Sequence, residues 1–367
     1  MDAEFAPVVR DGLLKKSLGC GVAIGVVDRG IRREFSYGAA RNDSIFEIGS
    51  ITKTFTGLAL AQFVVQGKLK LDAPIRSLIF PGLSAGTAGT EITLLDLATH
   101  RSGLPSVPDN LDPRDPDDPF ADYDQNALLQ YLTMHGTEKP ADAKYQYSSF
   151  GIGILGFVLA RNAGVPYVQM IRNEVTGPLQ MNDTGFELPP TQERRLIAGH
   201  NVDLEPIGKQ FTYGEVFSGA LAAKSTVGDL LTYLDANLHP ARYTAGAAPG
   251  ASAATLPAAI ALDHQLRAEV KPNTDVAIEW IYDRESKIFE HGGTTPGFTA
   301  HVEFAPDRDR GIVVLYNRMD GLPEQERFVD KIAENINELM AGTPAVRLDP
   351  VPADDPARDA LANGANN

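Results

Sequence analysis

The chain has 367 residues, of which 43% are hydrophobic and 22% charged, the balance of a soluble globular protein with a large core. Its 48 acidic and 33 basic residues leave a formal net charge of −15. A surface of that sign repels nucleic acid and anionic membranes, so we expect neither as a partner. No run approaches 18 apolar residues, and we therefore expect no membrane span.

The cysteine content and the first residues of the chain bear on the cellular compartment of the protein. Cys20 is the single cysteine, so no intrachain disulfide can form, and its place in the apolar run CGVAIGVV predicts a buried, unreactive side chain. The opening residues MDAEFAPVV lack the apolar segment of a signal peptide. We expect a cytoplasmic protein, or a periplasmic or secreted one from which a signal peptide has been removed.

In chain order, the first predicted elements are a helix, two strands and a second helix. Apolar residues at helical spacing predict a helix over residues 2–17. The segments GVAIGVVD and IRREFSYG predict two strands joined by a turn at residues 28–30. A helix is then predicted from about residue 51 to residue 66, with Gly67 ending it.

The middle of the chain, residues 70–215, has the patterns of helices joined by long loops. The stretch PSVPDNLDPRDPDDPFADYD is too rich in proline and aspartate for regular structure and predicts one long loop. The later segment AGAAPGASAATLPAA, residues 245–259, has low complexity and predicts a surface excursion.

Strands return in the last third of the chain, where four short segments with turns between them predict an antiparallel meander. They are DVAIEWIYD, KIFEH, TAHVEFAP and GIVVLYN. An amphipathic helix is predicted within residues 323–342, and the tail at 344–367 is predicted to be mobile.

Strands near both ends and helices between them predict an α+β fold, in which a sheet layer built from both parts of the chain carries an inserted helical domain. We assign residues 1–72 and 216–343 to a discontinuous sheet domain and residues 73–215 to a mainly helical domain. Residues 344–367 form the tail.

Two familiar patterns lack the context that their functions need. GLSAG at 82–86 matches a nucleophile elbow, but no strand precedes Ser84 and no helix follows it. GIGILG at 151–156 matches a dinucleotide-binding loop, but no crossover to a second parallel strand follows. We interpret Ser84 as a loop serine and these glycines as positions of close helix packing. No metal-binding or phosphate-binding motif occurs, so we expect neither a metal nor a cofactor.

The stretch FEIGSITKTFTG places Ser50 three residues before Lys53 at a predicted helix start. Residues i and i+3 share a helix face, so the lysine amine can reach the serine oxygen. A desolvated lysine loses its proton near neutral pH and can act as a base. The alternative is that Ser50 caps the helix while Lys53 lies on its solvated face, and this motif alone favours the cap.

Two later motifs add candidate residues. KYQYSSFGIG contains Tyr147, a candidate acid or base, with Ser149 two residues later. The alternative is a buried tyrosine at a helix start. In EHGGTTPGF a predicted strand ends at His291, and the glycines that follow suggest a ligand lying along the strand edge. The alternative there is a plain turn.

These motifs, in this order, resemble the serine β-lactamase and penicillin-binding superfamily. The branch that the chain looks most like holds the class C β-lactamases with the DD-carboxypeptidases, D-aminopeptidases and related esterases. Similar stretches also include ITLLDLATHRSGLP, GPLQMNDTGF and GIVVLYN, so the resemblance covers about residues 15–340. It implies the family's fold, in which an antiparallel sheet flanked by terminal helices carries an inserted helical domain.

The resemblance also implies roles for single residues and no cofactor. Ser50 would be the acylated nucleophile, Lys53 its partner and Tyr147 the general base. The backbone N–H groups of Ser50 and Thr294 would form the oxyanion hole. The strand triad that is Lys-Thr-Gly in class C β-lactamases corresponds to His291, Gly292 and Gly293.

Two departures from the family pattern bear on the substrate. Ser149 stands where class C enzymes have asparagine, and serine is shorter and lacks the amide donor. His291 stands in place of a lysine whose fixed charge lies near the substrate carboxylate, and histidine is mostly neutral at pH 7. Histidine occurs there in DD-peptidases and D-aminopeptidases, whereas many of the esterases carry tryptophan.

Three hypotheses follow for the activity. The first is a serine hydrolase that forms an acyl-Ser50 intermediate with D-alanyl peptides or β-lactams. The second is a carboxylesterase of the same fold that acts on short-chain esters. The third is a β-lactam or peptidoglycan sensor that stays acylated. In each of them the partner is a small molecule or a peptide.

Overall fold

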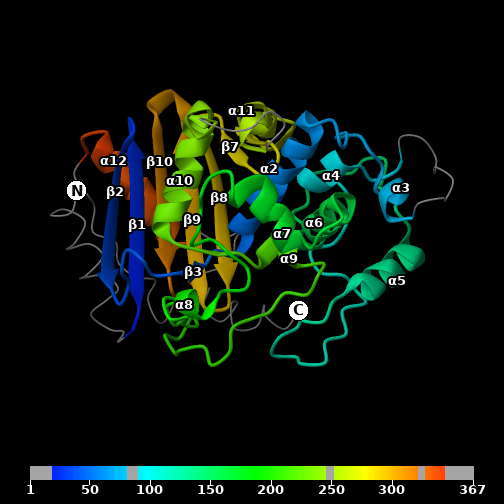
Figure 1. Ribbon diagram of the computed structural model, residues 1–367, viewed down its shortest axis with the longest axis horizontal. Helices are drawn as coiled ribbons and strands as arrows, with labels where there is room; N and C mark the ends of the chain where they lie inside the picture. Colours follow the sequence, from blue (N-terminus) through cyan, green and yellow to red (C-terminus); the bar gives the residue numbers. More distant parts are fainter. Residues whose placement is uncertain (1–18, 81–89, 245–251, 321–326, 344–367) are drawn as a thin grey trace.

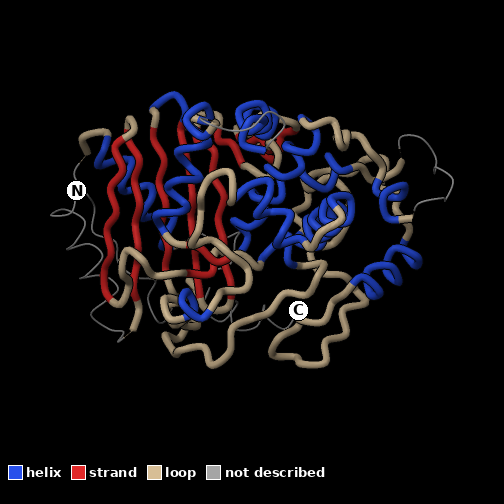
Figure 2. The backbone as a smooth tube through the Cα atoms, viewed as in Figure 1, coloured by secondary structure: helices blue, strands red, loops and turns tan. Residues whose placement is uncertain are grey.

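A sheet of eight antiparallel strands forms one side of the molecule, and most of the helices lie beside and over it (Figure 1). The computed structural model describes residues 19–80, 90–244, 252–320 and 327–343. The strand order is β2-β1-β10-β9-β8-β7-β6-β5, so the first and last strands of the described chain are neighbours. This arrangement confirms the predicted α+β fold, and Figure 2 shows the strands gathered on one side.

The strands of the large sheet come from two separate parts of the chain. They are β1 (Gly21–Asp28), β2 (Ile31–Gly38), β5 (Ala268–Lys271), β6 (Thr274–Val276), β7 (Ile281–Asp283), β8 (Ile288–Thr295), β9 (Phe298–Ala305) and β10 (Arg310–Tyr316). A separate two-stranded sheet pairs β3 (Phe46–Glu47) with β4 (Lys224–Ser225). The predicted turn at residues 28–30 joins β1 to β2, and Arg29 and Gly30 there both have positive φ, as such a turn requires.

The helices lie mainly between these two groups of strands. They are η1 (Gly49–Ile51), α2 (Thr52–Val65), α3 (Ile75–Ile79), α4 (Leu94–Ala98), α5 (Gln125–His135), α6 (Ser149–Ala163), α7 (Tyr167–Ile171), η2 (Arg172–Thr176), α8 (Pro190–Glu193), α9 (Ser218–Leu221), α10 (Val227–Leu238), η3 (Pro240–Tyr243), α11 (Ser252–Asp263), η4 (Pro306–Arg308) and α12 (Phe328–Met340). No helix or strand interrupts residues 105–124, which confirms the long loop. The predicted helix at 2–17, the Ser84 loop and the tail at 344–367 lie outside the described residues.

Both faces of the sheet are covered by helices. On one face, Val22, Ile24 and Val26 of β1 belong to an apolar cluster with the buried side of α12. On the other face, Gly25 packs so tightly against α10 that a methyl group there would lie 2.7 Å from the Leu231 side chain. Cys20 is buried in the α12 cluster, as predicted. The larger apolar cluster joins this second face of the sheet to the helices of the middle segment. The predicted division into two domains at residues 72/73 and 215/216 stays a prediction.

Two expectations about the late strands are wrong. The segment DVAIEWIYD is not one strand but two, β6 and β7, separated by a turn in which Glu279 has a φ of +64°. The turn forms because its N–H groups bond outside the sheet, from Ile278 to the Asp263 carbonyl and from Glu279 to the Ala98 carbonyl. The second error concerns β8, which does not end at His291. It continues to Thr295 because the glycines keep their pairing with β9.

The expectation of a surface excursion at residues 245–259 is wrong for its second half. Residues from Ser252 onward form α11, which packs along α2 and buries Leu256, Ala259 and Ile260. Small residues make a sequence look like low-complexity surface, but they also let two helices approach closely. Here they allow α11 to pack against α2, and this is why the segment is a helix.

Two of the three glycines of GIGILG, Gly153 and Gly156, serve close packing of α6, as predicted. A methyl group at Gly153 would lie 2.5 Å from the Val216 carbonyl oxygen, and one at Gly156 would lie 2.9 Å from the Gly219 Cα. Within the described ranges, no single helix has the length and apolar character to cross a bilayer. Helix α6 is long and apolar enough only when it is taken together with the segment at 167–176, and the two are bent by 79° relative to each other.

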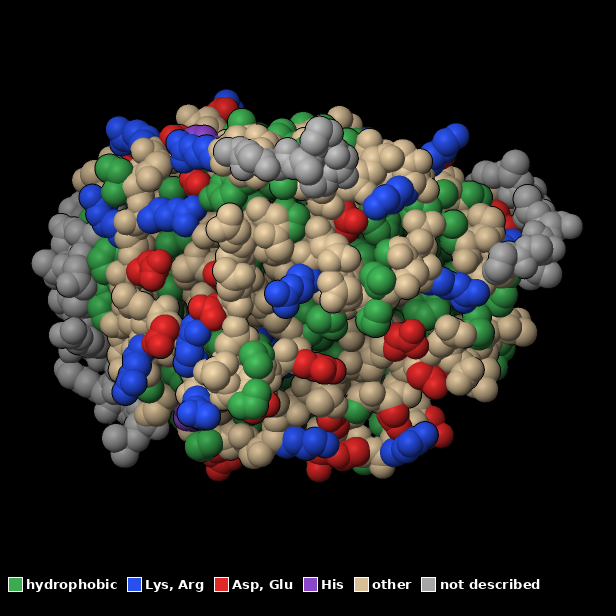
Figure 3. Space-filling model, in the orientation of Figure 1, with side chains coloured by type: hydrophobic (Ala, Val, Ile, Leu, Met, Phe, Trp, Pro, Cys, Tyr) green, Lys and Arg blue, Asp and Glu red, His purple; other side chains and the backbone are tan. Residues whose placement is uncertain are grey.

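Charged side chains of both signs are interspersed over the face shown in Figure 3. Acidic side chains are frequent along its lower edge, where Figure 1 places loops of the middle segment.

The α6 contact provides a stability test. We predict that Gly153→Ala lowers the free energy of unfolding by about 1–3 kcal/mol, because the added methyl group meets a backbone carbonyl that has no room to move. Gly151→Ala in the same helix is the control. Its nearest neighbour would be the Ser148 hydroxyl at 3.2 Å, so the higher helix propensity of alanine, up to about 1 kcal/mol, should offset the crowding. Denaturant unfolding measures both variants, and equal stabilities would contradict the packing role.

Candidate active site

Ser50 and Lys53 meet at the junction of η1 and α2. Lys53 Nζ and Ser50 Oγ are hydrogen-bonded at 2.8 Å, and Nζ also donates to the Ala220 carbonyl at 3.1 Å. The lysine side chain is 0% exposed and the serine 5% exposed. The three-residue spacing therefore brings together a hydroxyl and an amine that is removed from water.

The alternative in which Ser50 caps α2 and Lys53 lies on a solvated face is wrong. The N-cap position of α2 is Ile51, and no side chain makes a capping hydrogen bond there. The Thr52 hydroxyl instead donates to the Gly49 carbonyl at 2.6 Å. The Ser50 hydroxyl thus does not cap the helix and instead contacts Lys53 and Tyr147.

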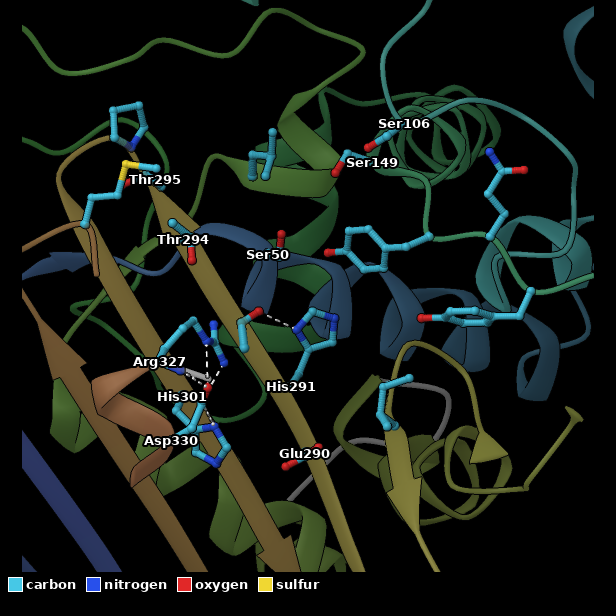
Figure 4. Close-up of a pocket in the computed structure, with 18 residues that line it drawn as sticks. Ser50, Ser106, Ser149, Glu290, His291, Thr294, Thr295, His301, Arg327 and Asp330 are labelled. Carbon is cyan, nitrogen blue, oxygen red and sulfur yellow. Dashed lines mark hydrogen bonds and ion pairs between the residues drawn. The ribbon is translucent and has the colours of Figure 1, made fainter. Parts of the chain in front are cut away.

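A cavity of about 1150 Å³ opens above Ser50 (Figure 4). It lies between β8, the segment before α6 and the start of α12. Six of the eight predicted site residues line it, and they are Ser50, Tyr147, Ser149, His291, Gly292 and Thr294. The other two, Lys53 and Gly293, lie behind this lining. The sequence positions are far apart, and the fold brings all eight to one place.

Strand β8 approaches the Ser50 backbone closely. Gly49 has a φ of +50°, and a methyl group on it would lie 2.7 Å from the Thr294 carbonyl oxygen. A methyl group on Gly293 would collide with the Ile48 carbonyl. The two glycines therefore let the backbone of Thr294 come up to that of Ser50, the pair predicted to hold an oxyanion.

Burial sets the proton affinities of Lys53 and Tyr147. It lowers the pKa of Lys53 to about 7, against a smaller opposing effect of the Glu279 carboxylate. It raises the pKa of Tyr147 above its ordinary value, although a hydrogen bond with Ser50 works against this. The Lys53 Nζ atom lies 5.0 Å from the centre of the Tyr147 ring. Near pH 7 the free amine and the ammonium of Lys53 are thus about equally populated, beside a protonated phenol.

His291 is neutral in this environment. Burial, and then the nearby charge of Lys53, lower the pKa of His291 to about 3. Its Nδ1–H donates to the Gly292 carbonyl at 2.7 Å, because a carbonyl oxygen can only accept. The neutral ring therefore keeps Nε2 as a hydrogen-bond acceptor. It does not supply the fixed positive charge that lysine has at this position in class C enzymes.

The two serines after Tyr147 have different places. Ser148 is the N-cap of α6, where its hydroxyl accepts from the Gly151 N–H at 2.8 Å and donates to the Pro105 carbonyl at 2.6 Å. Ser149 lines the cavity beside Ser106 (Figure 4). The helix start thus uses one serine for capping and presents the next one to the cavity.

Arg327 lines the cavity and was not expected from the sequence. Its guanidinium lies over Gly292, where any side chain would collide with it. Asp330 holds it by two hydrogen bonds, of 2.9 Å from Nε and 2.6 Å from Nη2, while Nη1 lies 3.5 Å from the Ala300 carbonyl. No motif marks Arg327, because it belongs to an ordinary amphipathic helix start. The one sequence signal was the glycine at position 292, which leaves room for another group.

Beside Arg327 lies a second charged cluster. The His301 ring lies between two carboxylates. Asp330 is 2.9 Å from Nδ1 (Figure 4), and Glu303 is 3.0 Å from Nε2. Burial alone would lower the pKa of His301, but these carboxylates override it and raise the pKa to about 10. Glu290, His301 and Glu303 each place one potential metal-ligand atom within 4.8 Å of the others. Both ring nitrogens are occupied by carboxylates, however, so the ring is a cation here.

A family model described as Beta-lactamase matches residues 11–334. The chain belongs to the Beta-lactamase family. A beta-lactamase of Pseudomonas fluorescens is 26% identical over 343 residues, covering 84% of this chain and 90% of that protein. The D-alanyl-D-alanine-carboxypeptidase/endopeptidase AmpH of Escherichia coli K12 is 27% identical over 363 residues, covering 94% of this chain and 92% of that protein.

Solved structures of Beta-lactamase family proteins have the same fold. The class C beta-lactamase of Rhodobacter sphaeroides superposes with a TM-score of 0.72 at 25% identity, covering 92% of this chain and 98% of that one. The beta-lactamase of Sulfitobacter sp. EE-36 gives 0.72 at 25% identity, covering 93% and 97%. The predicted resemblance is confirmed, and the chain is a β-lactamase-like serine hydrolase.

The state of Lys53 makes a pH prediction. We expect the rate of Ser50 acylation to rise with pH through about 7, because below that value the amine is protonated and accepts no proton. The neutral His291 should add no inflection of its own near its usual range. Labelling with a fluorescent penicillin from about pH 5 to about pH 11 measures the profile.

Tyr147→Phe is the companion variant for this profile. It should keep the same midpoint and label about 10²–10⁴-fold more slowly, because the base is retained and the phenol proton is lost. A midpoint near the ordinary lysine value, about 10.5, would show that Lys53 is not desolvated in solution.

Proposed function

We propose that the protein hydrolyses D-alanyl peptides or β-lactams through an acyl-Ser50 intermediate. The observation that carries this proposal is the 2.8 Å hydrogen bond between Ser50 Oγ and a fully buried Lys53 Nζ, below a cavity lined by Tyr147. Relatives named as beta-lactamases and as a D-alanyl-D-alanine-carboxypeptidase/endopeptidase support this choice of substrates.

Acylation uses the amine as base. The Ser50 proton moves to Lys53 Nζ while Oγ forms a bond to the substrate carbonyl carbon. The carbonyl oxygen becomes an oxyanion between the backbone N–H groups of Ser50 and Thr294. As the tetrahedral intermediate collapses, the leaving amine takes the proton of the Tyr147 phenol, which recovers one from the Lys53 ammonium. No proton is gained or lost in this cycle.

Deacylation reverses the direction of the protons. The oxygen of a water molecule attacks the acyl carbon and gives one proton to the Tyr147 oxygen, while the phenol passes its own proton to the Lys53 amine. The Ser50 oxygen leaves and takes the proton back. Two groups so close titrate as a unit, and the base of this step is therefore the pair.

Arg327 supports substrates that carry a carboxylate. Among the residues that the structure describes, its hydrogen bonds use three of the five N–H donors of a guanidinium, so two donors remain there for an anionic group of the substrate. The side chain is 5% exposed and lines the cavity over Gly292, next to His291. A carboxylate bound there would be held close to β8.

The second candidate is a carboxylesterase, and the charge state of the cavity favours it. His291 is neutral, and the cationic side chains lining the cavity in the described residues, Arg327 and His301, are each paired with carboxylates. Ser149 also lacks the amide with which asparagine could bind a peptide group. Such a cavity suits a neutral ester at least as well as an anion.

One parallel assay separates these candidates. Nitrocefin, a D-Ala-D-Ala peptide and p-nitrophenyl butyrate are offered to the same preparation, and turnover of the first or second supports the proposal. Turnover of the ester alone would replace it by the esterase. Intact mass followed over time after β-lactam addition tests the sensor hypothesis, since a mass that returns to its starting value excludes a permanently acylated protein.

Ser50→Ala is expected to abolish both turnover and covalent labelling, because the attacking oxygen is removed. Ser106→Ala is the matched control, since Ser106 lines the same cavity, whereas the hydrogen bonds that Lys53 makes to described residues go to Ser50 and Ala220. It should keep labelling within about threefold of the wild type, as expected for a residue outside the chemistry. Undiminished labelling of Ser50→Ala would end the proposal.

A further inference from the structure

His100 follows helix α4 in a backbone conformation that usually belongs to glycine. The His100 N–H donates to the Leu97 carbonyl at 3.1 Å, and the Arg101 N–H donates to the Asp96 carbonyl at 2.8 Å. These two bonds form a Schellman motif, in which the second residue after the helix is left-handed and is most often glycine. His100 has that place, with a φ of +54°. A side chain is thus kept where the backbone would be less strained without one.

Tyr147 lies on a stretch of chain without regular secondary structure. Residues 143–148, between a turn and α6, belong to no helix or strand. Such a stretch holds a side chain in place only through its contacts with neighbouring segments. The Tyr147 phenol must nevertheless stay beside Ser50, with which it is hydrogen-bonded, and beside Lys53, whose Nζ lies 5.0 Å from the ring centre.

His100 holds the residues on both sides of Tyr147. Its carbonyl accepts from the Gln146 N–H at 2.7 Å, and its ring nitrogen Nδ1 accepts from the Ser148 N–H at 3.1 Å. Because both acceptors belong to one residue and span the tyrosine, they restrict the direction in which the tyrosine side chain leaves the backbone. The His100 ring also packs on the Tyr147 ring, with centroids 4.5 Å apart.

The His100 ring is itself held in one orientation. The residue is 2% exposed, and the Tyr145 ring stands at 83° to it with centroids 5.5 Å apart. A backbone N–H can only donate, so the neutral ring carries its proton on Nε2, which lies 3.4 Å from a Glu279 oxygen. Burial, and then the nearby charge of Lys53, lower the pKa of His100 to about 3, so Nδ1 remains an acceptor at neutral pH.

We propose that His100 is a positioning residue of the active site, which sets the place and direction of the Tyr147 phenol through the two flanking residues and the ring contact. This role rests on the proposed acyl-Ser50 chemistry, in which the phenol gives its proton to the leaving amine. His100 is not among the residues that line the cavity, and it gains and loses no proton in the reaction.

Packing alone accounts for the burial of His100 but not for a polar ring in a left-handed position. An apolar side chain would fill the same space, and glycine would relieve the backbone. The Ser148 N–H, however, needs an acceptor at the Nδ1 position. Asparagine carries its amide oxygen the same number of bonds from the backbone and also tolerates a left-handed conformation, which makes it the conservative substitution.

The test is a double-mutant cycle with Tyr147→Phe in the full chain. His100→Leu removes the ring acceptor and keeps a bulky side chain, whereas His100→Asn keeps an acceptor. Each is made in the wild type and in Tyr147→Phe, where the aromatic ring remains and the phenol oxygen is gone. The rate of labelling by a fluorescent penicillin and the thermal unfolding temperature are measured for every variant.

In the wild-type background we expect His100→Leu to label about 10- to 100-fold more slowly, because a displaced phenol transfers its proton less well. His100→Asn should label at least about fivefold faster than His100→Leu, since the Ser148 N–H regains an acceptor. In the Tyr147→Phe background, His100→Leu should change the rate by less than about threefold, because no phenol is left to position.

A merely structural role gives a different pattern. His100→Leu would then slow labelling by the same factor in both backgrounds, and that result would overturn the proposal. An unchanged rate of His100→Leu in the wild-type background would overturn it as well. So would a His100→Asn variant that labels as slowly as His100→Leu and unfolds at the same temperature.

His264→Leu is the control for the loss of an imidazole elsewhere in the core. The His264 ring is hydrogen-bonded to Asn237 at 2.8 Å and packs on Phe304, and the residue is not among those that line the cavity. This variant should label within about threefold of the wild type, even if it unfolds at a lower temperature. A loss as large as that of His100→Leu would assign the effect to general destabilisation and count against His100.

Should His100→Leu not fold, His100→Gln carries the same cycle. Its amide lies one bond further from the backbone and is out of place for the Ser148 N–H, and equal losses in both backgrounds would again overturn the proposal. A Tyr147→Phe variant that labels as fast as the wild type would remove the phenol from the chemistry and the positioning role with it. Absence of labelling in the wild type would instead refute the acyl-Ser50 function.

Discussion

An ammonium group that is taken out of water loses several kcal/mol of hydration, and the active site depends on this cost at Lys53. The side chain is 0% exposed, enclosed by the start of α2, the Ala220 carbonyl and the ring of Tyr147. The free amine is therefore nearly as stable as the ammonium at neutral pH, with a pKa of about 7. A weakly held proton next to a serine hydroxyl is what makes the hydroxyl reactive.

A second constraint is steric and concerns the approach of β8 to η1. The backbone of Thr294 can lie against that of Ser50 because Gly49 and Gly293 have no side chains. Glycine at position 292 likewise admits the guanidinium of Arg327 from the far side of the strand. These three glycines determine how close the β8 backbone can come to the Ser50 oxygen. The amine of Lys53 can serve as a base only if a substrate carbonyl can reach that oxygen.

The cavity contains many charges but little net charge. Arg327 is held by Asp330, and His301 lies between Asp330 and Glu303, while His291 is neutral. Substrate choice then depends on hydrogen-bond geometry and shape more than on long-range attraction. This differs from the fixed lysine charge of the class C pattern.

The amino-acid sequence by itself determined the fold class, the long loop and the packing role of Gly153 and Gly156, because these follow from local spacing and composition. For Ser50 and Lys53 the local spacing made a contact possible but by itself favoured a helix cap. It misplaced the turn at Glu279 and the end of β8, since both depend on partners distant in sequence. Only the tertiary structure decided that Lys53 is buried rather than solvated and that Arg327 lines the cavity. Burial and counter-charge are properties of surroundings assembled from the whole chain, and no local pattern contains them.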